Sequence, residues 1–466
     1  MSKINETNKM NVNEQFKYLN IGLPDRILRK KNYGDFEDAM GMIDVLLDSG
    51  KGTEGFRACL RVQREIMARL PEDYPYTFDE AVELAQSYIP DFTAEELKGL
   101  EKEGRIDWIY IDGVPHYFSA FFANLCETDD SYAARAGKVK PRGDNGNFDY
   151  RHEILGKLKE NGELVNRIKI RASVRIHDDE FKAGEEVLVH LPLPAACEEQ
   201  SVIRIENMFP ENGLTDDEDA LQRTVSWKET MTENHEFSVE YSYTYRLTYK
   251  DPWNMEADSE QPGFFTEEKA PHIVFTPYIR DLVSGLTEGA ENNLDKAKRF
   301  YNFVTENVNY SFSREYFGLE SIAESCARNL VGDCGIQTLL FITLCRCAGI
   351  PARWESGLAA GPDRCGPHDW AKIYVAPLGW FHVDCSRGGS AYRQGDKLLH
   401  KFYFGNVAGD AMVANREFQG DFKVEKSHWR ADPYDNQVGE IETESRGLRY
   451  SQFDSTRTVV EFEKII

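Results

Sequence analysis

Two stretches of sequence decide the fold: residues 332–353, GDCGIQTLLFITLCRCAGIPAR, and residues 368–384, HDWAKIYVAPLGWFHVD. The first is apolar on nearly every side of a helix predicted from Cys334 to about Cys347, and such a helix is buried. The second favours two strands, Ala371–Val375 and Leu378–Asp384, with a short loop between them. A buried helix beside such strands indicates a core of mixed α and β structure.

Cys334 falls in the first turn of the predicted helix. The unpaired backbone N–H groups and the positive end of the helix dipole favour a thiolate there. Gly332 and Gly335 would let a substrate backbone come close to the sulfur. Asp333 can cap the helix, although its charge opposes thiolate formation. Taken alone, a cysteine in this position is more often an ordinary buried residue than a nucleophile.

His368 and Asp384 supply the groups that such a nucleophile needs. Together with His382 they share one parity along the two strands, so they are predicted to point to one face. His368 lies opposite Asp384 if the loop is about 375–377, whereas a loop centred on Leu378 separates them by four residues. A carboxylate opposite an imidazole fixes its tautomer, and the other ring nitrogen then faces the thiol.

These motifs together resemble those of transglutaminase-like proteins. Residues 332–335 and 344–353 look like the nucleophile helix and the turn that follows it. Residues 368–374 are similar to the histidine strand of the family, and residues 379–384 to its aspartate strand. The resemblance covers about residues 271–390. It implies a papain-like core in which a helix bearing Cys packs against a sheet bearing His and Asp.

The resemblance also implies a role for each residue of the triad. Cys334 is expected to be the nucleophile, His368 the general base and then acid, and Asp384 the residue that orients the imidazole. The backbone N–H of Cys334 is an expected oxyanion donor. Tyr310 stands where many relatives place an aromatic or polar residue, so it is a candidate second donor; core packing is the alternative.

Three further residues lie close to the motifs. Trp370 and Trp380 flank the predicted site and could line a substrate groove for the acyl group, although core packing explains them equally well. His382 could support the triad, but a structural histidine is the more common outcome.

A metal site is not expected. Nine cysteines are present, five of them close to the motifs: Cys326, Cys345, Cys347, Cys365 and Cys385. A zinc site can be predicted with confidence from paired C-x-x-C motifs, and this sequence has no such pair. That difference also separates the chain from the peptide N-glycanase branch of the superfamily. No glycine motif of the phosphate-binding or dinucleotide-binding type stands out between a predicted strand and a predicted helix, so we expect no cofactor.

The first part of the chain is predicted to be helical. Asp35, Thr53, Thr77 and Thr93 each precede an apolar helical pattern, and the last two fit the capping-box motif with Glu80 and Glu96. Asp112-Gly113 is the turn of a short hairpin between Ile106 and Phe118.

Strict alternation of apolar and polar residues begins near residue 160. It runs through residues 165–176, 187–193 and 237–249, and it indicates strands with one face exposed to solvent. We therefore expect an α+β multidomain fold. Its predicted parts are a helical module (1–150), an antiparallel β-sandwich-like domain (151–255), a transglutaminase-like α+β core (265–435) and a C-terminal extension with a strand at Thr458–Phe462 (436–466).

Composition narrows the possible partners and compartments. The net charge of −24 disfavours nucleic acid, because phosphate binding needs a basic face. No stretch approaches the roughly 18 apolar residues of a membrane helix, so no membrane is expected. The N-terminus has no apolar run of signal-peptide type, and an odd, irregular set of cysteines fits a reducing compartment. We expect a cytoplasmic protein.

The triad supplies acyl transfer from an amide through a thioester. Water as acceptor gives a cysteine protease or amidase, and an amine gives a protein-glutamine transglutaminase. Animal transglutaminases carry further β-domains after the core, and the sequence after Asp384 is short, so hydrolysis of a peptide or related amide is favoured. The expected partner is a peptide or protein substrate. Two alternatives stay open: a non-catalytic protein-binding module that keeps the fold, and a metal-stabilised scaffold.

Overall fold

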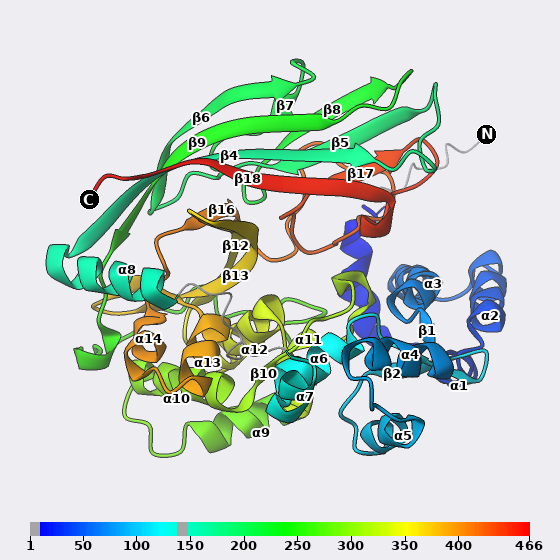
Figure 1. Cartoon of the computed structure of the whole chain (residues 1–466), viewed down its shortest axis with the longest axis horizontal. Helices are drawn as coiled ribbons and strands as arrows, with labels where there is room; N and C mark the ends of the chain where they lie inside the picture. Colours follow the sequence, from blue (N-terminus) through cyan, green and yellow to red (C-terminus); the bar gives the residue numbers. More distant parts are fainter. Residues whose placement is uncertain (1–9, 138–147) are drawn as a thin grey trace.

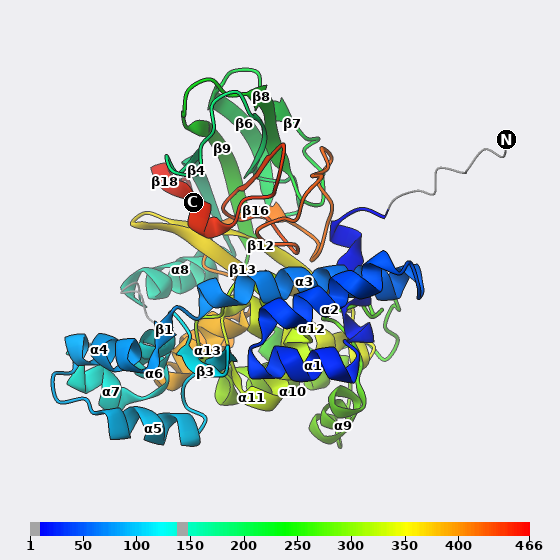
Figure 2. The same cartoon turned by 90° about the vertical axis from the view of Figure 1, so that its right-hand side faces the viewer.

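The structure is a computed structural model and describes residues 10–137 and 148–466. A β-sandwich lies at the top of Figure 1, a five-stranded sheet below it, and the helices of the core at the bottom. The N-terminal helices lie beside the core, and Figure 2 shows α1, α2 and α3 running across it. The predicted signal-free N-terminus falls partly outside the described residues, because residues 1–9 are not among them.

The N-terminal module is helical, as predicted. It contains η1 (Asn13–Ile21), α1 (Asp25–Tyr33), α2 (Phe36–Asp48), α3 (Glu54–Asp73), β1 (Tyr76–Thr77), α4 (Phe78–Tyr88), α5 (Ala94–Lys102), β2 (Trp108–Ile111), β3 (Val114–Tyr117), α6 (Phe121–Thr128) and α7 (Asp130–Arg135).

Most of the predicted caps of this module are present. The hydroxyl of Thr53 accepts from the N–H of Phe56, and Thr77 and Glu80 form the reciprocal capping box. Thr93 caps α5 through its side chain. The side chain of Asp35 does not cap α2, because Asp35 pairs with Lys30 at 2.7 Å instead.

The Asp112-Gly113 turn joins β2 and β3 as predicted. Both residues have positive φ, 50° and 75°. Such values are typical of the turn that matches the twist of a two-residue hairpin.

The β-sandwich consists of two antiparallel four-stranded sheets. One has the order β17-β5-β8-β7 and the other β18-β4-β9-β6. Trp227 on β8 contacts Phe237 on β9 across the two sheets, with 5.7 Å between ring centroids. The elements are α8 (Phe148–Asn161), β4 (Glu163–Ile176), β5 (Glu186–Pro192), β6 (Gln200–Phe209), β7 (Leu214–Thr215), β8 (Thr224–Thr230), β9 (Phe237–Thr248), η2 (Pro252–Asn254), β17 (Glu440–Thr443), η4 (Tyr450–Gln452) and β18 (Phe453–Lys464).

The last part of the chain completes this sandwich. β17 pairs with β5, and β18 pairs with β4 from Phe453↔Ile176 to Lys464↔Asn166. Alternation predicts a strand near residues 458–462 but says nothing about its partner, because pairing across nearly 300 residues leaves no local signal. The four predicted domain ranges stay predictions.

The core is a five-stranded antiparallel sheet, order β15-β14-β13-β12-β16, with helices packed on one face. Its elements are α9 (Pro277–Leu286), α10 (Asn293–Asn307), β10 (Asn309–Tyr310), η3 (Tyr316–Gly318), α11 (Ile322–Asn329), β11 (Val331–Gly332), α12 (Cys334–Cys347), β12 (Ala352–Gly361), β13 (Arg364–Val375), β14 (Gly379–Val383), α13 (Cys385–Arg393), α14 (Lys397–Phe402), β15 (Phe404–Gly405) and β16 (Ala411–Asn415).

Helix α12 has the predicted bounds and environment. Every residue from Gly335 to Cys345 is buried, as the all-round apolar pattern requires. The α+β fold class with a helical module, an antiparallel sandwich and a mixed core is therefore confirmed. In the described ranges, no helix combines the length and the apolarity needed to cross a bilayer.

Candidate active site

Cys334 is the first residue of α12, and the turn before it is held in place by three contacts. Asp333 caps the helix by accepting from the N–H of Ile336 over 3.0 Å. The Gln337 side chain donates to the carbonyl of Gly332 over 2.8 Å. The hydroxyl of Tyr316 donates to the Asp333 carboxylate. The thiol is therefore presented from a fixed backbone at a helix N-terminus.

Gly335 allows neighbouring groups to approach the thiol-bearing turn. A Cβ at this position would lie 2.3 Å from the Tyr316 hydroxyl oxygen and 3.1 Å from Oδ2 of Asp369. The first distance is a clash, so glycine is required here to let Tyr316 reach Asp333.

His368 and Asp384 are brought together as predicted. Nε2 of His368 lies 2.7 Å from Oδ2 of Asp384. The Asp384 side chain is fully buried, whereas that of His368 is 12% exposed. Asp384 also caps α13, because its Oδ1 accepts from the N–H of Arg387 over 3.0 Å. The carboxylate thus engages one ring nitrogen and leaves Nδ1 of His368 for another group.

The turn between β13 and β14 lies between the two predicted registers. Val375 pairs with Gly379, so the turn is centred on Pro377. Asp384 lies just beyond the end of β14, and the continued register places it two residues along the sheet from the position opposite His368. The imidazole still reaches the carboxylate, because a diagonal neighbour on a sheet is within range of a long side chain.

The pKa values of both side chains are lowered in this pair. Burial raises the pKa of Asp384, but the adjacent His368 and then Arg387 outweigh that effect and lower it to about 2. Burial lowers the pKa of His368, and the Asp384 carboxylate opposes this effect. The pair therefore rests as a neutral imidazole beside a carboxylate.

The thiol itself makes a contact that the sequence does not predict. Sγ of Cys334 donates to Oδ2 of Asp369 over 3.0 Å. The side-chain amide of Gln437 donates to Oδ1 of Asp369 over 2.7 Å and to the carbonyl of His368 over 3.1 Å. Asp369 is the direct neighbour of His368, but alternation along a strand would place the two on opposite faces, so no sequence signal points to it.

The Asp369 contact changes the state expected for the thiol. Burial first, and then the carboxylates of Asp369 and Asp333, raise the pKa of Cys334 well above its usual range. Burial and then Asp435 raise the pKa of Asp369 as well. The expectation that the helix N-terminus favours a thiolate is thus outweighed in this arrangement, and the thiol keeps its proton.

Cys334 and His368 open into one cavity of about 170 Å³. The predicted oxyanion residue Tyr310 lines it too, which places three of the predicted site residues around one space. The lining residues are Glu127, Arg151, Tyr310, Phe312, Cys334, Ala359, Arg364, Pro367, His368, Ser386, Arg387 and Arg393.

The two tryptophans of the predicted groove lie elsewhere. Trp370 is 1% exposed, and its indole N–H donates to Oε2 of the buried Glu355 over 2.9 Å. Trp380 packs against Phe264 and the guanidinium of Arg353, 4.4 Å from its ring centroid. Neither lines the cavity at Cys334, because both side chains belong to packed clusters of the sheet and its surrounding loops.

His382 shares this second environment. Its Nε2 lies 3.7 Å from Glu355 and 3.8 Å from Glu199, beside Lys372 rather than beside the triad. Burial lowers its pKa to about 3, so it stays neutral as a structural residue.

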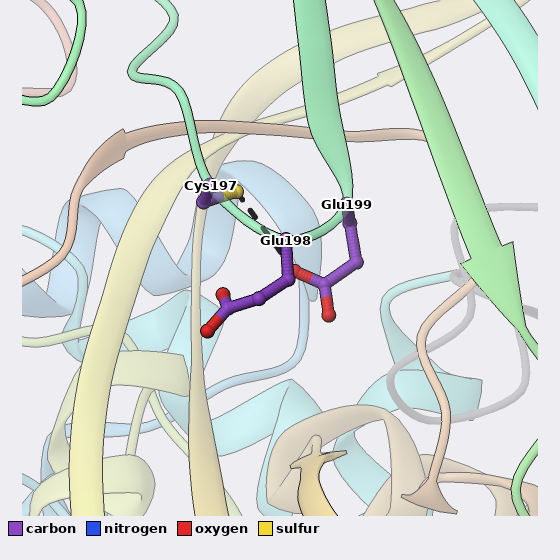
Figure 3. A group of neighbouring side chains, drawn as sticks. All are labelled: Cys197, Glu198 and Glu199. Atoms are coloured by element: carbon purple, nitrogen blue, oxygen red, sulfur yellow. Dashed lines mark hydrogen bonds between the residues drawn. The ribbon is translucent and has the colours of Figure 1, made fainter.

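One group in the described residues offers three possible metal ligands: Cys197, Glu198 and Glu199, drawn in Figure 3. Cations already occupy its carboxylates, because Nζ of Lys372 lies 2.8 Å from Glu199 and 3.2 Å from Glu198. Burial raises the pKa of Cys197 to about 12, so its thiol is protonated and a poor ligand. The nine cysteines are all free thiols.

Comparison with known proteins finds the same family on this part of the chain. The family model of the transglutaminase-like superfamily matches residues 280–385. The uncharacterised protein YebA of Bacillus subtilis strain 168 is 25% identical over 132 residues, which are 24% of this chain and 17% of that protein. The chain therefore matches less than a fifth of that relative's length.

The solved structures that this chain resembles have lower sequence identity to it. A protein from Cytophaga hutchinsonii described as a candidate cysteine protease covers 65% of this chain and 91% of its own, at 16% identity and a TM-score of 0.43. The periplasmic domain of TgpA from Pseudomonas aeruginosa covers 53% of this chain and 96% of its own, at 13% identity and a TM-score of 0.28. The similarity that bears on identity is the match of residues 280–385, which include Cys334, His368 and Asp384, to the transglutaminase-like superfamily.

Proposed function

We propose that the protein is a cysteine enzyme that hydrolyses a peptide or related amide through Cys334, His368 and Asp384. The observation that carries the proposal is that Cys334 and His368 line one cavity, and that Asp384 holds His368 from behind at 2.7 Å. A nucleophile, a base and a group that orients the base are the parts that covalent acyl transfer requires.

The first half of the reaction forms a thioester. The Cys334 proton passes to Nδ1 of His368, and Sγ attacks the carbonyl carbon of the amide. The oxyanion that develops is bound by the N–H of Cys334 and, in our proposal, by the hydroxyl of Tyr310. The C–N bond then breaks, and the leaving amine takes the proton from His368.

The second half returns the free enzyme. His368 removes a proton from water, the hydroxide attacks the thioester carbon, and the C–S bond breaks. The acid product leaves, and the thiolate regains its proton from the imidazolium. An amine in place of water would give a transamidation product by the same steps, so the acceptor is what the assay has to distinguish.

The resting thiol has to leave Asp369 before it can react. Its proton is held by the Asp369 carboxylate at 3.0 Å, and burial lowers the pKa of His368, so an ion pair between thiolate and imidazolium is disfavoured at rest. Proton transfer to His368 is therefore expected to accompany substrate binding, which displaces water and reorders the site.

Intact-mass labelling with a peptide-based thiol probe tests the proposal. One adduct is expected in the wild type and none in Cys334→Ala, whereas Cys347→Ala, at the opposite end of α12, should label normally. Incubation of candidate peptides with and without a primary amine then separates hydrolysis from transamidation. An unlabelled but well-folded wild type would instead favour a non-catalytic protein-binding module.

We also propose a reducing compartment, the cytoplasm, as its location. The nine free thiols support this, since unpaired cysteines in such number are unusual in oxidising compartments. Fractionation of cells that express a tagged chain would test it.

A further inference from the structure

A second cavity, of about 600 Å³, lies where the N-terminal module meets the core, and we call it the seam cavity. Its volume falls within the roughly 300–1,000 Å³ of typical small-molecule sites. One wall comes from residues 104–107 and from α6 of the module, and the other from residues of the core between 309 and 336. Figure 1 shows α6 beside β10 at this seam.

The seam cavity reaches the turn that carries the thiol. Gly332 and Ile336 line it, and they lie two residues before and two residues after Cys334. Phe312 lines both the seam cavity and the cavity at Cys334. An extended chain that passes Phe312 could therefore occupy the seam cavity and present an amide to the thiol.

Phe312 is an exposed aromatic residue at the junction of the two cavities. It is 45% exposed, and its ring packs edge-on against Tyr310, with 5.7 Å between centroids and 90° between planes. Tyr310 is the candidate oxyanion donor, so the Phe312 ring lies beside the place where the scissile carbonyl would bind. An aromatic ring in such a position can bury a large apolar area against a ligand.

The N-terminal module holds Phe312 in this position. The side chain of Asn124 on α6 donates to the carbonyl of Phe312 over 2.9 Å and accepts from its N–H over 2.7 Å. One side chain of the module thus binds both polar groups of the Phe312 backbone and leaves the ring available for contact. The module contributes in this way to the surroundings of the thiol.

The charged residues of the seam cavity already have partners within the protein. Two arginines and two carboxylates occur among the lining residues that the structure describes. Their contacts are Arg105 with Asp129, Glu320 with Lys31, and both Arg314 and Asp107 with the hydroxyl of Tyr74. A charged side chain of a ligand would lose its water and find these opposite charges engaged, which is unfavourable.

The rest of the lining is neutral. Apolar side chains such as Ile106, Leu319 and Val331 occur together with amide and hydroxyl side chains such as Asn309 and Ser313. The apolar groups can bury an apolar side chain, and the polar ones can form hydrogen bonds with the N–H and C=O groups of a peptide. This combination suits an uncharged segment of polypeptide.

We propose that the seam cavity binds the part of the substrate next to the scissile amide, and that this part is an uncharged peptide segment with an apolar side chain against Phe312. This inference rests on the proposed function of Cys334. It adds the chemical class of the substrate and names Phe312 as the residue that determines specificity. Asn124 is the residue that positions Phe312.

Peptide reagents that alkylate Cys334 test this preference without a known substrate. Sγ displaces chloride from a CH₂ group, so a C–S bond forms as the C–Cl bond breaks, and the thiol proton passes to solvent. One series consists of chloroacetyl dipeptide amides and the other of N-acetyl dipeptide chloromethyl ketones, each made with two leucines, two glutamates or two lysines. The two series extend the peptide in opposite directions from the thiol.

The readout is the rate constant of each peptide reagent divided by that of chloroacetamide or chloroacetone, which carry the same reactive group without a peptide. A change in the reactivity of the thiol cancels in this ratio. We expect the ratio to be highest for the leucine reagent in at least one series. It should fall about tenfold in Phe312→Ala, as for the loss of an aromatic anchor. Phe312→Leu should keep part of the preference, and Asn124→Ala should lose part of it.

Two variants away from the seam cavity serve as controls. Phe209→Ala removes an aromatic residue of β6 that is 53% exposed. Asn20→Ala removes a side chain of the module that donates to the carbonyl of Pro271 in the core over 2.9 Å but does not line the seam cavity. Both should keep the wild-type ratios. Equal ratios for the three dipeptides in both series, or a leucine preference that Phe312→Ala leaves unchanged, would overturn the proposal.

Binding to Cys334→Ala separates this inference from the proposed chemistry. Calorimetric titration with the N-acetyl amide of the leucine dipeptide should show binding that the glutamate dipeptide lacks and that a further Phe312→Ala change weakens. Such binding, together with a wild type that cleaves no peptide, would refute the catalytic proposal alone. Peptide cleavage by the wild type, with no binding of either compound to Cys334→Ala, would refute the role of the seam cavity alone.

Discussion

At the scale of single residues, Asp369 controls the proton of the proposed nucleophile. Its carboxylate accepts from the Cys334 thiol, and a negative charge 3.0 Å away opposes formation of a thiolate. Asp369→Asn keeps the size of the side chain and removes the charge. We therefore expect the pKa of Cys334 to fall and its alkylation by iodoacetamide near pH 7 to accelerate several-fold.

The pH dependence of this effect has a definite sign. Burial and Asp435 raise the pKa of Asp369, so its charge is present only above that raised value. The rate ratio of Asp369→Asn to wild type should thus grow as the pH rises through that raised pKa. Asp363→Asn, at the exposed tip of the same hairpin, is the control. A ratio of one at every pH at which both proteins stay folded would show that Asp369 does not restrain the thiol.

Asp384 has two contacts that one substitution can separate. It orients His368, and it caps α13 by accepting from the N–H of Arg387. Asp384→Asn can still cap the helix but no longer stabilises an imidazolium, so turnover should fall on the order of 10³–10⁴-fold, as for the equivalent change in serine proteases. Turnover is measured with a candidate peptide that the wild type is found to cleave, and the thermal unfolding midpoint serves as the control for folding. Unchanged turnover would leave Asp384 with the structural role only.

The sequence predicts the role of Asp384 but not that of Asp369, and the reason is physical. Asp384 directly follows strand β14, and its parity relative to His368 can be counted along the two strands, so its face follows from local geometry. Asp369 meets the thiol through the way α12 packs on the sheet, and the arginines of the cavity come from three elements far apart in the chain. Contacts of that kind depend on the tertiary structure, so they produce no characteristic spacing of residues in the sequence.

At the scale of elements, the N-terminus of α12 combines good helix geometry with close packing. Gly335→Ala should gain roughly 1 kcal/mol in helix propensity. The added methyl group would lie 2.3 Å from the Tyr316 hydroxyl, which is bound to Asp333. Overpacking of this kind costs about 1–3 kcal/mol, so the variant should be less stable on balance.

Gly41 in α2 provides the matched control for this prediction. A Cβ there meets nothing within 4 Å. Gly41→Ala should therefore stabilise the protein by roughly 0.5–1 kcal/mol. Chemical denaturation of both variants measures the change in the free energy of unfolding, which should be negative for Gly335→Ala and positive for Gly41→Ala. A stabilised Gly335→Ala protein would mean that Tyr316 moves away at no cost.

Elements were predictable where their signals are local. The bounds of α12, the Thr53 and Thr77 caps and the Asp112-Gly113 turn follow from a few neighbouring residues. Trp370 illustrates the limit, because alternation places it on one face of β13 but not against Glu355, which comes from β12. What packs against a face is decided by another part of the chain.

At the scale of the whole molecule, the N-terminal module meets the core through half-buried carboxylates. The N–H of Glu315 in the core donates to Asp73 at the end of α3 over 3.3 Å, and Arg69 lies 3.9 Å from the Glu315 carboxylate. Burial is the main cause that raises the pKa of Glu315 to about 7 and that of Asp73 to about 6. The junction should therefore respond to pH near neutrality.

The sign follows from the raised pKa values. The folded chain binds protons at these groups more tightly than the unfolded chain, so their contribution to stability is present below about pH 4.5 and is lost as the pH rises through 7. For Glu315 the loss is at most on the order of 3 kcal/mol. Asp384 and Glu198, whose pKa values are lowered to about 2, titrate outside this window.

Glu315→Gln should flatten this dependence, because the amide is neutral at every pH in the range. We expect the thermal unfolding midpoint of the wild type to fall from pH 5 to pH 8, and that of Glu315→Gln to fall less and to lie higher at pH 8. Glu83→Gln, on the exposed face of α4, should follow the wild type. Parallel curves for Glu315→Gln and wild type would show that this carboxylate titrates alike in the folded and the unfolded chain, and that it is not the source of the pH dependence.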